Sequence, residues 1–155
     1  MLTAGNWDRF AAREPEAMEA MCRERGIVWL VDREADVKGL RVYGSPWVPR
    51  FGDMAFNLGR GEPLRQVWQK LPHGLDLLVT HGPPYGILDR MFLGLAVGDE
   101  TLREAVLQKT PRFHVFGHIH EARGTGQVEG CPTQFLNVAS SRLLSGVFEP
   151  TMLEL

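Results

Sequence analysis

The sequence predicts an α/β fold, a layered sandwich in which helices flank a mixed β-sheet. Strand-like apolar runs alternate with helical apolar stripes along most of the chain. The chain then closes with strand-like runs that have no helix between them, which favours a mixed sheet over a purely parallel one. The 155 residues suit a single domain, residues 1–155, and contain no internal repeat.

The first part of the chain predicts one helix followed by two strands. Pro15 begins the helix and Gly26 suits its cap, because proline favours a first turn and glycine a left-handed C-terminus. Apolar runs at 27–31 and 40–44 predict strands. Residues 32–39 between them are interpreted as a connection or a short hairpin.

The second part predicts helices and strands in alternation, after a loop rich in proline and glycine at 45–53. One helix runs from Pro63 to Pro72, and another follows Asp99 and stops at Pro111. The predicted strands are 75–79, 113–116, 133–140 and 146–155. The first of these is almost continuously apolar, as expected of a strand buried on both faces.

Composition narrows the classes of function. A net charge of −2 provides no basic field for holding a nucleic-acid polymer, so none is expected as a partner. No apolar stretch approaches the ~20 residues that span a bilayer, and the start does not resemble a signal peptide. Cys22 and Cys131 do not make a disulfide framework. We therefore expect a cytoplasmic protein with no membrane partner.

Histidines follow two of the predicted buried strands. His81 comes after 75–79, whereas His118 and His120 come after 113–116. Ligands in open α/β sheets bind outside the carboxyl ends of the strands, so these rings should converge at one edge. Imidazole ligands suit a borderline divalent metal such as Mn²⁺, Fe²⁺ or Zn²⁺.

Each of these signals is weak when taken singly. His81 before Gly-Pro-Pro could be a turn residue, and a lone H-x-H on a strand rarely identifies a metal site. The stretch LTAGNWD (2–8) also places Asn6 and Asp8 after an apolar start, which alone is ordinary turn chemistry. The joint placement at strand ends favours the metal site. His114, inside a predicted strand, is interpreted as structural.

Three motifs, in order, carry a family resemblance: GNWD (5–8), THGPP (80–84) and GHIHE (117–121). They resemble the later motifs of the calcineurin-like metallophosphoesterases. The chain is most similar to the small metallophosphoesterase-domain-containing (MPPED-type) branch, and the resemblance covers nearly its whole length. It implies the calcineurin-like phosphoesterase fold, truncated at the N-terminus.

The resemblance also implies roles for individual residues. Asn6, His81 and His118 would be ligands of one metal, Mn²⁺ being the most expected, and His120 would belong to a second. Two metals of this kind generate a hydroxide nucleophile and clamp phosphoryl oxygens. Asp8 matches the family's acidic residue, which orients the histidine before it.

The sequence departs from its family in two ways. It begins at the third motif, so the D-x-H and G-D motifs that supply the bridging carboxylate are absent. Trp7 stands where the family has a catalytic histidine, and indole has no titratable proton near neutrality. One metal ion or none is therefore expected in the isolated chain. Either Met1 is an internal start, or the chain self-associates as a homo-oligomer that covers an exposed sheet edge.

Two functions remain open on this reading. The first is a metal-dependent phosphoesterase that acts on phosphomonoesters or phosphodiesters, with small phosphate esters and nucleotides as candidate substrates. The second is a catalytically weak or inactive relative that binds nucleotides or a protein partner. Trp7 and the missing carboxylates favour the second, whereas the four candidate ligands favour the first.

Overall fold

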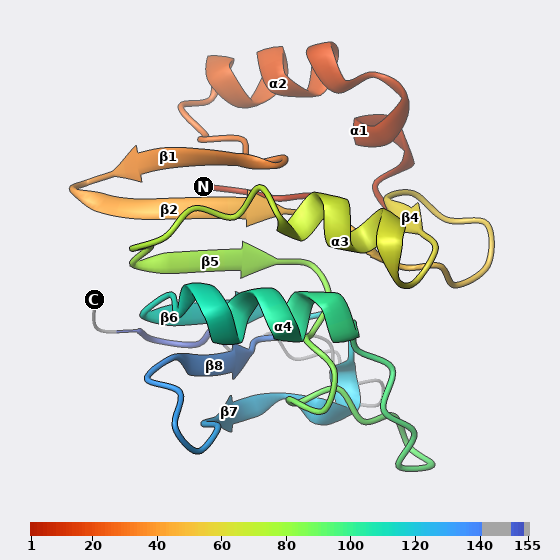
Figure 1. Ribbon diagram of the computed structural model, residues 1–155. Coiled ribbons are helices and arrows are strands. Elements are labelled where there is room, and N and C mark those ends of the chain that lie inside the picture. Colours follow the sequence, from red (N-terminus) through yellow and green to blue (C-terminus); the bar gives the residue numbers. More distant parts are fainter. Residues whose placement is uncertain (141–149, 154–155) are drawn as a thin grey trace.

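A six-stranded mixed sheet forms the centre of the computed structural model, which describes residues 1–140 and 150–153 (Figure 1). In spatial order its strands are β1 (Arg33–Val37), β2 (Leu40–Ser45), β5 (Leu77–Thr80), β6 (Phe113–Phe116), β8 (Gln134–Asn137) and β7 (Gly124–Gly126). The four inner strands are parallel, and each edge strand runs antiparallel to its neighbour. The predicted mixed α/β sheet is therefore confirmed.

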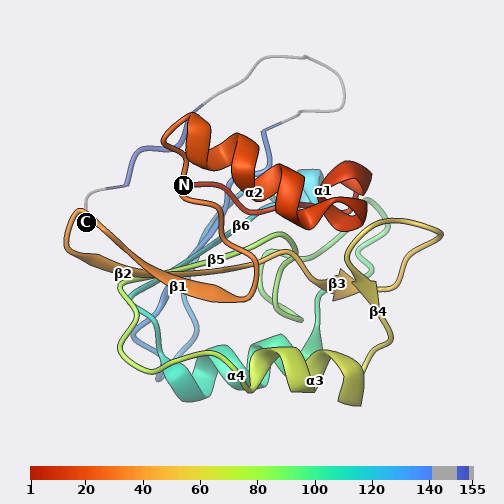
Figure 2. The same cartoon turned by 90° about the horizontal axis from the view of Figure 1, so that it is seen from above.

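Helices cover both faces of this sheet (Figure 2). Helices α3 (Glu62–Trp68) and α4 (Glu100–Lys109) pack on one face, while α1 (Arg9–Arg13) and α2 (Pro15–Glu24) lie on the other. A small parallel pair, β3 (Val48–Pro49) and β4 (Asn57–Leu58), and a short 3₁₀ helix, η1 (His120–Ala122), complete the described elements. The predicted helices beginning near Pro15, Pro63 and Asp99 are confirmed.

Two apolar layers hold the sandwich together. Between the sheet and α3–α4, the side chains of Leu64, Trp68, Val106, Phe116 and Phe135 are almost completely buried. A second cluster on the opposite face includes Leu30, Val42, Leu77, Phe113 and Leu136. The central strands are thus buried on both faces, which explains why 75–79 reads as a continuous apolar run.

The predicted strand at 27–31 is wrong. Only an isolated parallel bridge joins Trp29 to Leu2, although Leu30 is fully buried. Pairing stops at Asp32, which has φ of 49° and turns the chain into β1. Of the two alternatives for residues 32–39, the structure favours the hairpin. Most of the expected connection is itself a strand, β1, which pairs with β2 through a turn whose central residues, Lys38 and Gly39, both have positive φ.

Several short elements escaped the sequence prediction. The missed elements are α1, β1, β3, β4, η1 and β7. Each has five residues or fewer, which is too short to establish a hydrophobic period. Most of the predicted last strand, 146–155, lies outside the described residues, and residues 150–153 are not in a strand. Within the described ranges, no helix is long and apolar enough to cross a membrane.

Candidate metal centre

The carboxyl ends of β5 and β6 bring two histidines into contact. His81 follows the last residue of β5, and His118 comes two residues after the end of β6. Because the two strands are adjacent and parallel, both rings emerge at the same edge of the sheet. Their centroids lie 4.7 Å apart with an interplanar angle of 62°. His118 has φ of 69°, a left-handed conformation that is uncommon outside glycine and points to a local constraint.

Asn6 reaches the same edge from the N-terminal segment. Its Oδ1 atom lies 2.9 Å from Nε2 of His81. The Asn6 side chain is 5% exposed, and its Nδ2 donates to Sδ of Met54. The backbone carbonyl of Asn6 also accepts from the N–H of Ala55 at 3.0 Å. Asn6 is therefore held from both sides with its oxygen directed at the histidine.

Gly5 makes room for the His81 ring. A Cβ atom at position 5 would lie 2.6 Å from Cε1 and 2.8 Å from Nδ1 of His81, closer than such atoms approach in proteins. The imidazole thus lies directly against the backbone of residue 5. This contact could not be predicted from the sequence, because nothing in the local pattern around Gly5 reveals which ring packs on the glycine.

Asp8 closes the turn that presents Asn6. Its Oδ2 accepts from the backbone N–H of Gly5 at 2.6 Å. The carboxylate therefore acts on the loop backbone, and the residue before it is Trp7, whose side chain is 75% exposed. The structure places Asp8 beside the candidate ligands, where it supports the loop that carries Asn6.

The histidines favour their neutral forms. Burial, together with the nearby His118 and His120, lowers the pKa of His81 to about 4. The pKa of His118 is also lowered, first by burial and then by His120. His120 itself lies in η1, half-buried at the rim. Neutral imidazoles have a free lone pair at neutral pH, which a metal ligand requires.

The donor set fits one divalent ion. An amide oxygen and two imidazole nitrogens match the ligand preferences of borderline metals, and water can complete the coordination. Among the residues that the structure describes, no group of three or more His, Cys, Asp or Glu side chains is placed to hold a metal. A metal at this edge would need the amide oxygen of Asn6 beside His81 and His118, and the described residues bring no carboxylate to bridge a pair of ions.

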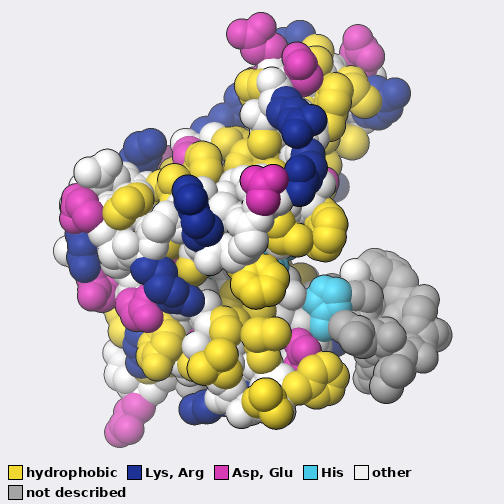
Figure 3. Space-filling model, turned by 90° about the vertical axis from the view of Figure 1, so that its right-hand side faces the viewer, with side chains coloured by type: hydrophobic (Ala, Val, Ile, Leu, Met, Phe, Trp, Pro, Cys, Tyr) yellow, Lys and Arg dark blue, Asp and Glu magenta, His cyan; other side chains and the backbone are white. Residues whose placement is uncertain are grey.

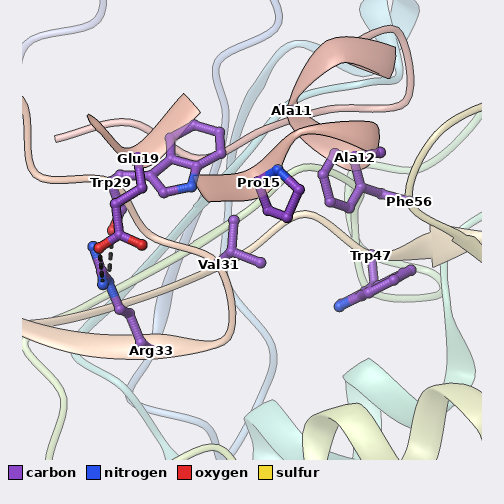
Figure 4. A pocket seen from close by; sticks show the side chains of 9 residues that line it. All are labelled: Ala11, Ala12, Pro15, Glu19, Trp29, Val31, Arg33, Trp47 and Phe56. Carbon is purple, nitrogen blue, oxygen red and sulfur yellow. Dashed lines mark hydrogen bonds and ion pairs between the residues drawn. The ribbon is translucent and has the colours of Figure 1, made fainter. Parts of the chain in front are cut away.

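An apolar groove lies elsewhere, between the helix pair α1–α2 and the sheet (Figure 4). It has a volume of about 270 Å³, and its walls include Trp29, Val31 and Phe56. The ion pair between Glu19 and Arg33, 2.7 Å long, stands at one end. None of the candidate metal ligands lines this groove, so the candidate metal centre at the carboxyl ends of β5 and β6 is a separate place.

The fold and this donor set define a class of protein, an α/β domain with candidate metal ligands at the carboxyl ends of parallel strands. Metallophosphoesterase domain-containing protein 1 of Homo sapiens is 44% identical to the chain over 114 residues. A UPF0046 protein of Caenorhabditis elegans is 40% identical over 111 residues. These alignments cover 72% and 71% of this chain. No family model matches the chain.

The chain belongs to the metallophosphoesterase-domain-containing branch of the calcineurin-like metallophosphoesterases. It spans about a third of the length of the curated relatives it matches, 34% of the human protein and 28% of the worm protein. A solved crystal structure superposes with a TM-score of 0.65 over 88% of this chain and 56% of its own, at 19% identity. That likeness concerns the fold alone.

Proposed function

We propose that this domain is a metal-dependent phosphoesterase that hydrolyses small phosphomonoesters or phosphodiesters, nucleotides among them. The observation that supports the proposal most directly is the 2.9 Å approach of Asn6 Oδ1 to His81 Nε2, with the His118 ring stacked edge-on beside it. A bound divalent ion would polarise a phosphoryl oxygen and lower the pKa of a bound water.

Individual residues of the chain have separate roles in this proposal. Asn6, His81 and His118 hold one ion, for which Mn²⁺ is the first candidate and Fe²⁺ or Zn²⁺ the alternatives. His120 lies at the rim of the site, where it could be a ligand of a second ion. The 2.6 Å bond from Gly5 N–H to Asp8 keeps the Asn6 loop in place. One ion per chain is the stoichiometry that these donors support.

A second candidate function is binding without catalysis. Trp7 takes the place of the family's catalytic histidine, and its side chain is 75% exposed beside Asn6. Indole cannot donate a proton to a leaving group near neutral pH, but it offers a flat apolar surface to a nucleobase or to a protein. In this alternative, the protein would bind a nucleotide or a protein partner at the sheet edge that carries Asn6, without hydrolysing it.

We also propose that the protein is cytoplasmic and acts on a small phosphate ester. We further propose that a second copy of the chain covers an exposed sheet edge. Exposed apolar side chains near the N-terminus support a second copy, with Leu2 42% and Phe10 51% exposed. Leu2 pairs through its backbone with 28–30 on one side.

Metal stoichiometry tests the first candidate. After loading with Mn²⁺ and desalting, plasma mass spectrometry should find one ion per chain. A His81→Ala variant should retain less than a tenth of it, whereas His73→Ala should match the wild type, because His73 contacts Lys109 outside the site. Equal retention in wild type and His81→Ala would refute the assignment of the ligands.

Restoring the histidine separates the two candidate functions. A Trp7→His variant with added Mn²⁺ should hydrolyse p-nitrophenyl phosphate or bis(p-nitrophenyl) phosphate at least about tenfold faster than wild type, since a placed general acid contributes ~10²–10⁴-fold. If this variant binds Mn²⁺ but gains no activity, the binding function is the correct one.

A further inference from the structure

A short, ordered hairpin projects between β5 and α4. Its strands meet at an antiparallel bridge between Arg90 and Ala96. Inside it, Met91 N–H donates to the carbonyl of Leu95 at 3.0 Å, and Gly94 N–H donates to that of Met91 at 2.8 Å. Nη1 of Arg90 donates to the carbonyl of Gly94 at 2.7 Å. Residues 90–95, the apolar hairpin, therefore form a fixed turn.

The tip of the apolar hairpin presents its apolar side chains to water. The exposed fractions are 41% for Met91, 75% for Phe92, 97% for Leu93 and 64% for Leu95. Three consecutive apolar residues and a fourth nearby are thus exposed at one point. Exposed apolar runs of this kind lower the solubility of a protein, and they are typical of surfaces that bind a partner.

The base of the apolar hairpin is anchored to the body of the protein. Asp89 is 1% exposed, and its Oδ2 accepts from Gly98 N–H at 2.9 Å. Arg60 donates to the carbonyls of Val97 and Gly98 at 2.7 and 2.6 Å. This base keeps the apolar side chains outside, because the loop cannot fold back to bury them without breaking these bonds.

The apolar hairpin projects from the edge that carries the histidines. Nδ2 of Asn137 donates both to the carbonyl of Leu88, at the hairpin's base, and to that of Ile119, next to His118. Figure 1 shows the segment between β5 and α4 reaching outward at the lower right. In Figure 3, which looks onto this edge, hydrophobic side chains gather below the histidine.

We propose that the apolar hairpin docks the protein on the surface of an anionic lipid bilayer, with Phe92 and Leu93 inserted among the lipid chains. The tip is convex and comprises four side chains, whereas a stable protein interface uses ~20–30 residues a side. A few apolar residues on a protrusion suit shallow insertion into the headgroup and acyl boundary.

Charge complementarity supports an anionic surface. Residues 90–97 contain one arginine and no acidic residue. Arg103 lies at the base, where its Nη1 donates to the carbonyl of Tyr85 at 2.9 Å. Basic side chains beside an inserted apolar tip are attracted to anionic lipids. This docking needs no spanning helix, and it is an alternative to the sequence-based expectation of no membrane partner, which stays a prediction.

Vesicle co-sedimentation tests the proposal with the full chain and no added metal. The wild type should bind vesicles of phosphatidylcholine and phosphatidylserine, and bind pure phosphatidylcholine at least about fivefold less tightly. Phe92→Ser/Leu93→Ser should lower the partition constant by at least about tenfold, since each side chain loses its apolar transfer free energy. Met21→Ser on α2, 43% exposed, is the matched control and should bind like wild type.

Two outcomes would overturn the proposal. The first is that wild type fails to bind either vesicle, and the second is that the double variant binds as well as wild type. If the first outcome comes with a dimer in sedimentation velocity that dissociates in the double variant, the partner of the apolar hairpin is a second copy of the chain. Circular dichroism of the double variant should show an unchanged fold, because neither side chain is buried.

Discussion

Single residues set the geometry of the candidate metal centre, and Gly5 is the most restrictive of them. A methyl group at this position would lie 2.6 Å from Cε1 of His81, so the ring would have to move. A Gly5→Ala variant should bind Mn²⁺ at least about tenfold more weakly. It should also lose about 1–3 kcal/mol of unfolding free energy, as overpacked sites do. Titration calorimetry and urea denaturation measure the two effects.

Gly59→Ala is the matched control for this variant. A Cβ there would meet only Cγ of Pro63, at an ordinary 3.8 Å. This control should keep wild-type metal affinity and change stability by less than about 1 kcal/mol. Wild-type Mn²⁺ affinity in Gly5→Ala would show that His81 does not bind metal from the position it occupies here.

His114 should make the stability of the fold depend on pH. It is fully buried, its Nε2 lies 2.8 Å from Oγ1 of Thr80, and burial lowers its pKa to about 3. An unfolded histidine binds a proton near pH 6.5, so below that pH the unfolded state holds more protons and stability falls until about pH 3. This one residue should cost about 2 kcal/mol between pH 7 and pH 5.

A His114→Leu variant isolates that contribution. The variant is expected to be less stable at pH 7, because it removes the bond to Thr80 and puts a branched side chain where a flat ring packs. Its unfolding free energy, from urea denaturation at a series of pH values, should however fall less steeply between pH 7 and pH 5. Parallel curves for the two proteins would mean that His114 is protonated in the folded state at pH 5.

At the scale of elements, Asp99 fixes the start of α4 and ties it to α3. Its carboxylate accepts from the N–H groups of Thr101 at 3.0 Å and Leu102 at 3.3 Å, and from Nε1 of buried Trp68. Asp99→Ala should therefore lose about 2–4 kcal/mol, since it removes an N-cap and leaves a buried indole donor unpaired. Urea denaturation measures this loss.

Asp36→Ala provides the comparison for Asp99→Ala. The Asp36 carboxylate accepts from the N–H of Gly39, in an exposed turn. Its removal should cost less than about 1 kcal/mol. Similar losses in the two variants would mean that the Asp99 network contributes no more than a surface turn does.

The elements predicted correctly are those whose own residues determine their ends. Pro15 and Asp99 begin their helices as expected. The β1–β2 hairpin was only one of two alternatives for residues 32–39, and β1 itself was not predicted as a strand. The prediction for 27–31 is wrong because a strand needs a partner, and its only one is the brief N-terminal segment at Leu2. Pairing across the fold cannot be read from a local period.

Some contacts of the candidate metal centre could likewise be predicted from the sequence, and others could not. The approach of His81 to His118 could be predicted, because adjacent parallel strands deliver residues to one edge. The contact of His81 with Gly5 and the bond from Asn6 to Met54 could not, since they join segments from different layers. Whether these residues bind metal stays a prediction that only metal measurements decide.

At the scale of the whole molecule, the candidate ligands join separate parts of the fold. Asn6 belongs to the N-terminal segment beside α1, whereas His81 and His118 follow neighbouring strands of the main sheet. A bound ion would therefore cross-link two layers. Because it binds only the folded arrangement of these three residues, the whole domain should gain stability from it.

Mn²⁺ should accordingly raise the melting temperature of the entire chain. At a concentration of 100 times the dissociation constant, binding adds about 2.7 kcal/mol, which corresponds to a shift of about 5–10 °C for a domain of this size. Differential scanning calorimetry across a Mn²⁺ titration measures the shift. Asn6→Ala and His81→Ala should each abolish most of it, and Mg²⁺ should produce less, since two imidazoles suit a borderline ion better than a hard one. A shift of equal size in His81→Ala would show that the ion binds elsewhere. No shift in wild type would show that the histidine motifs do not bind Mn²⁺, and would favour binding without catalysis as the function.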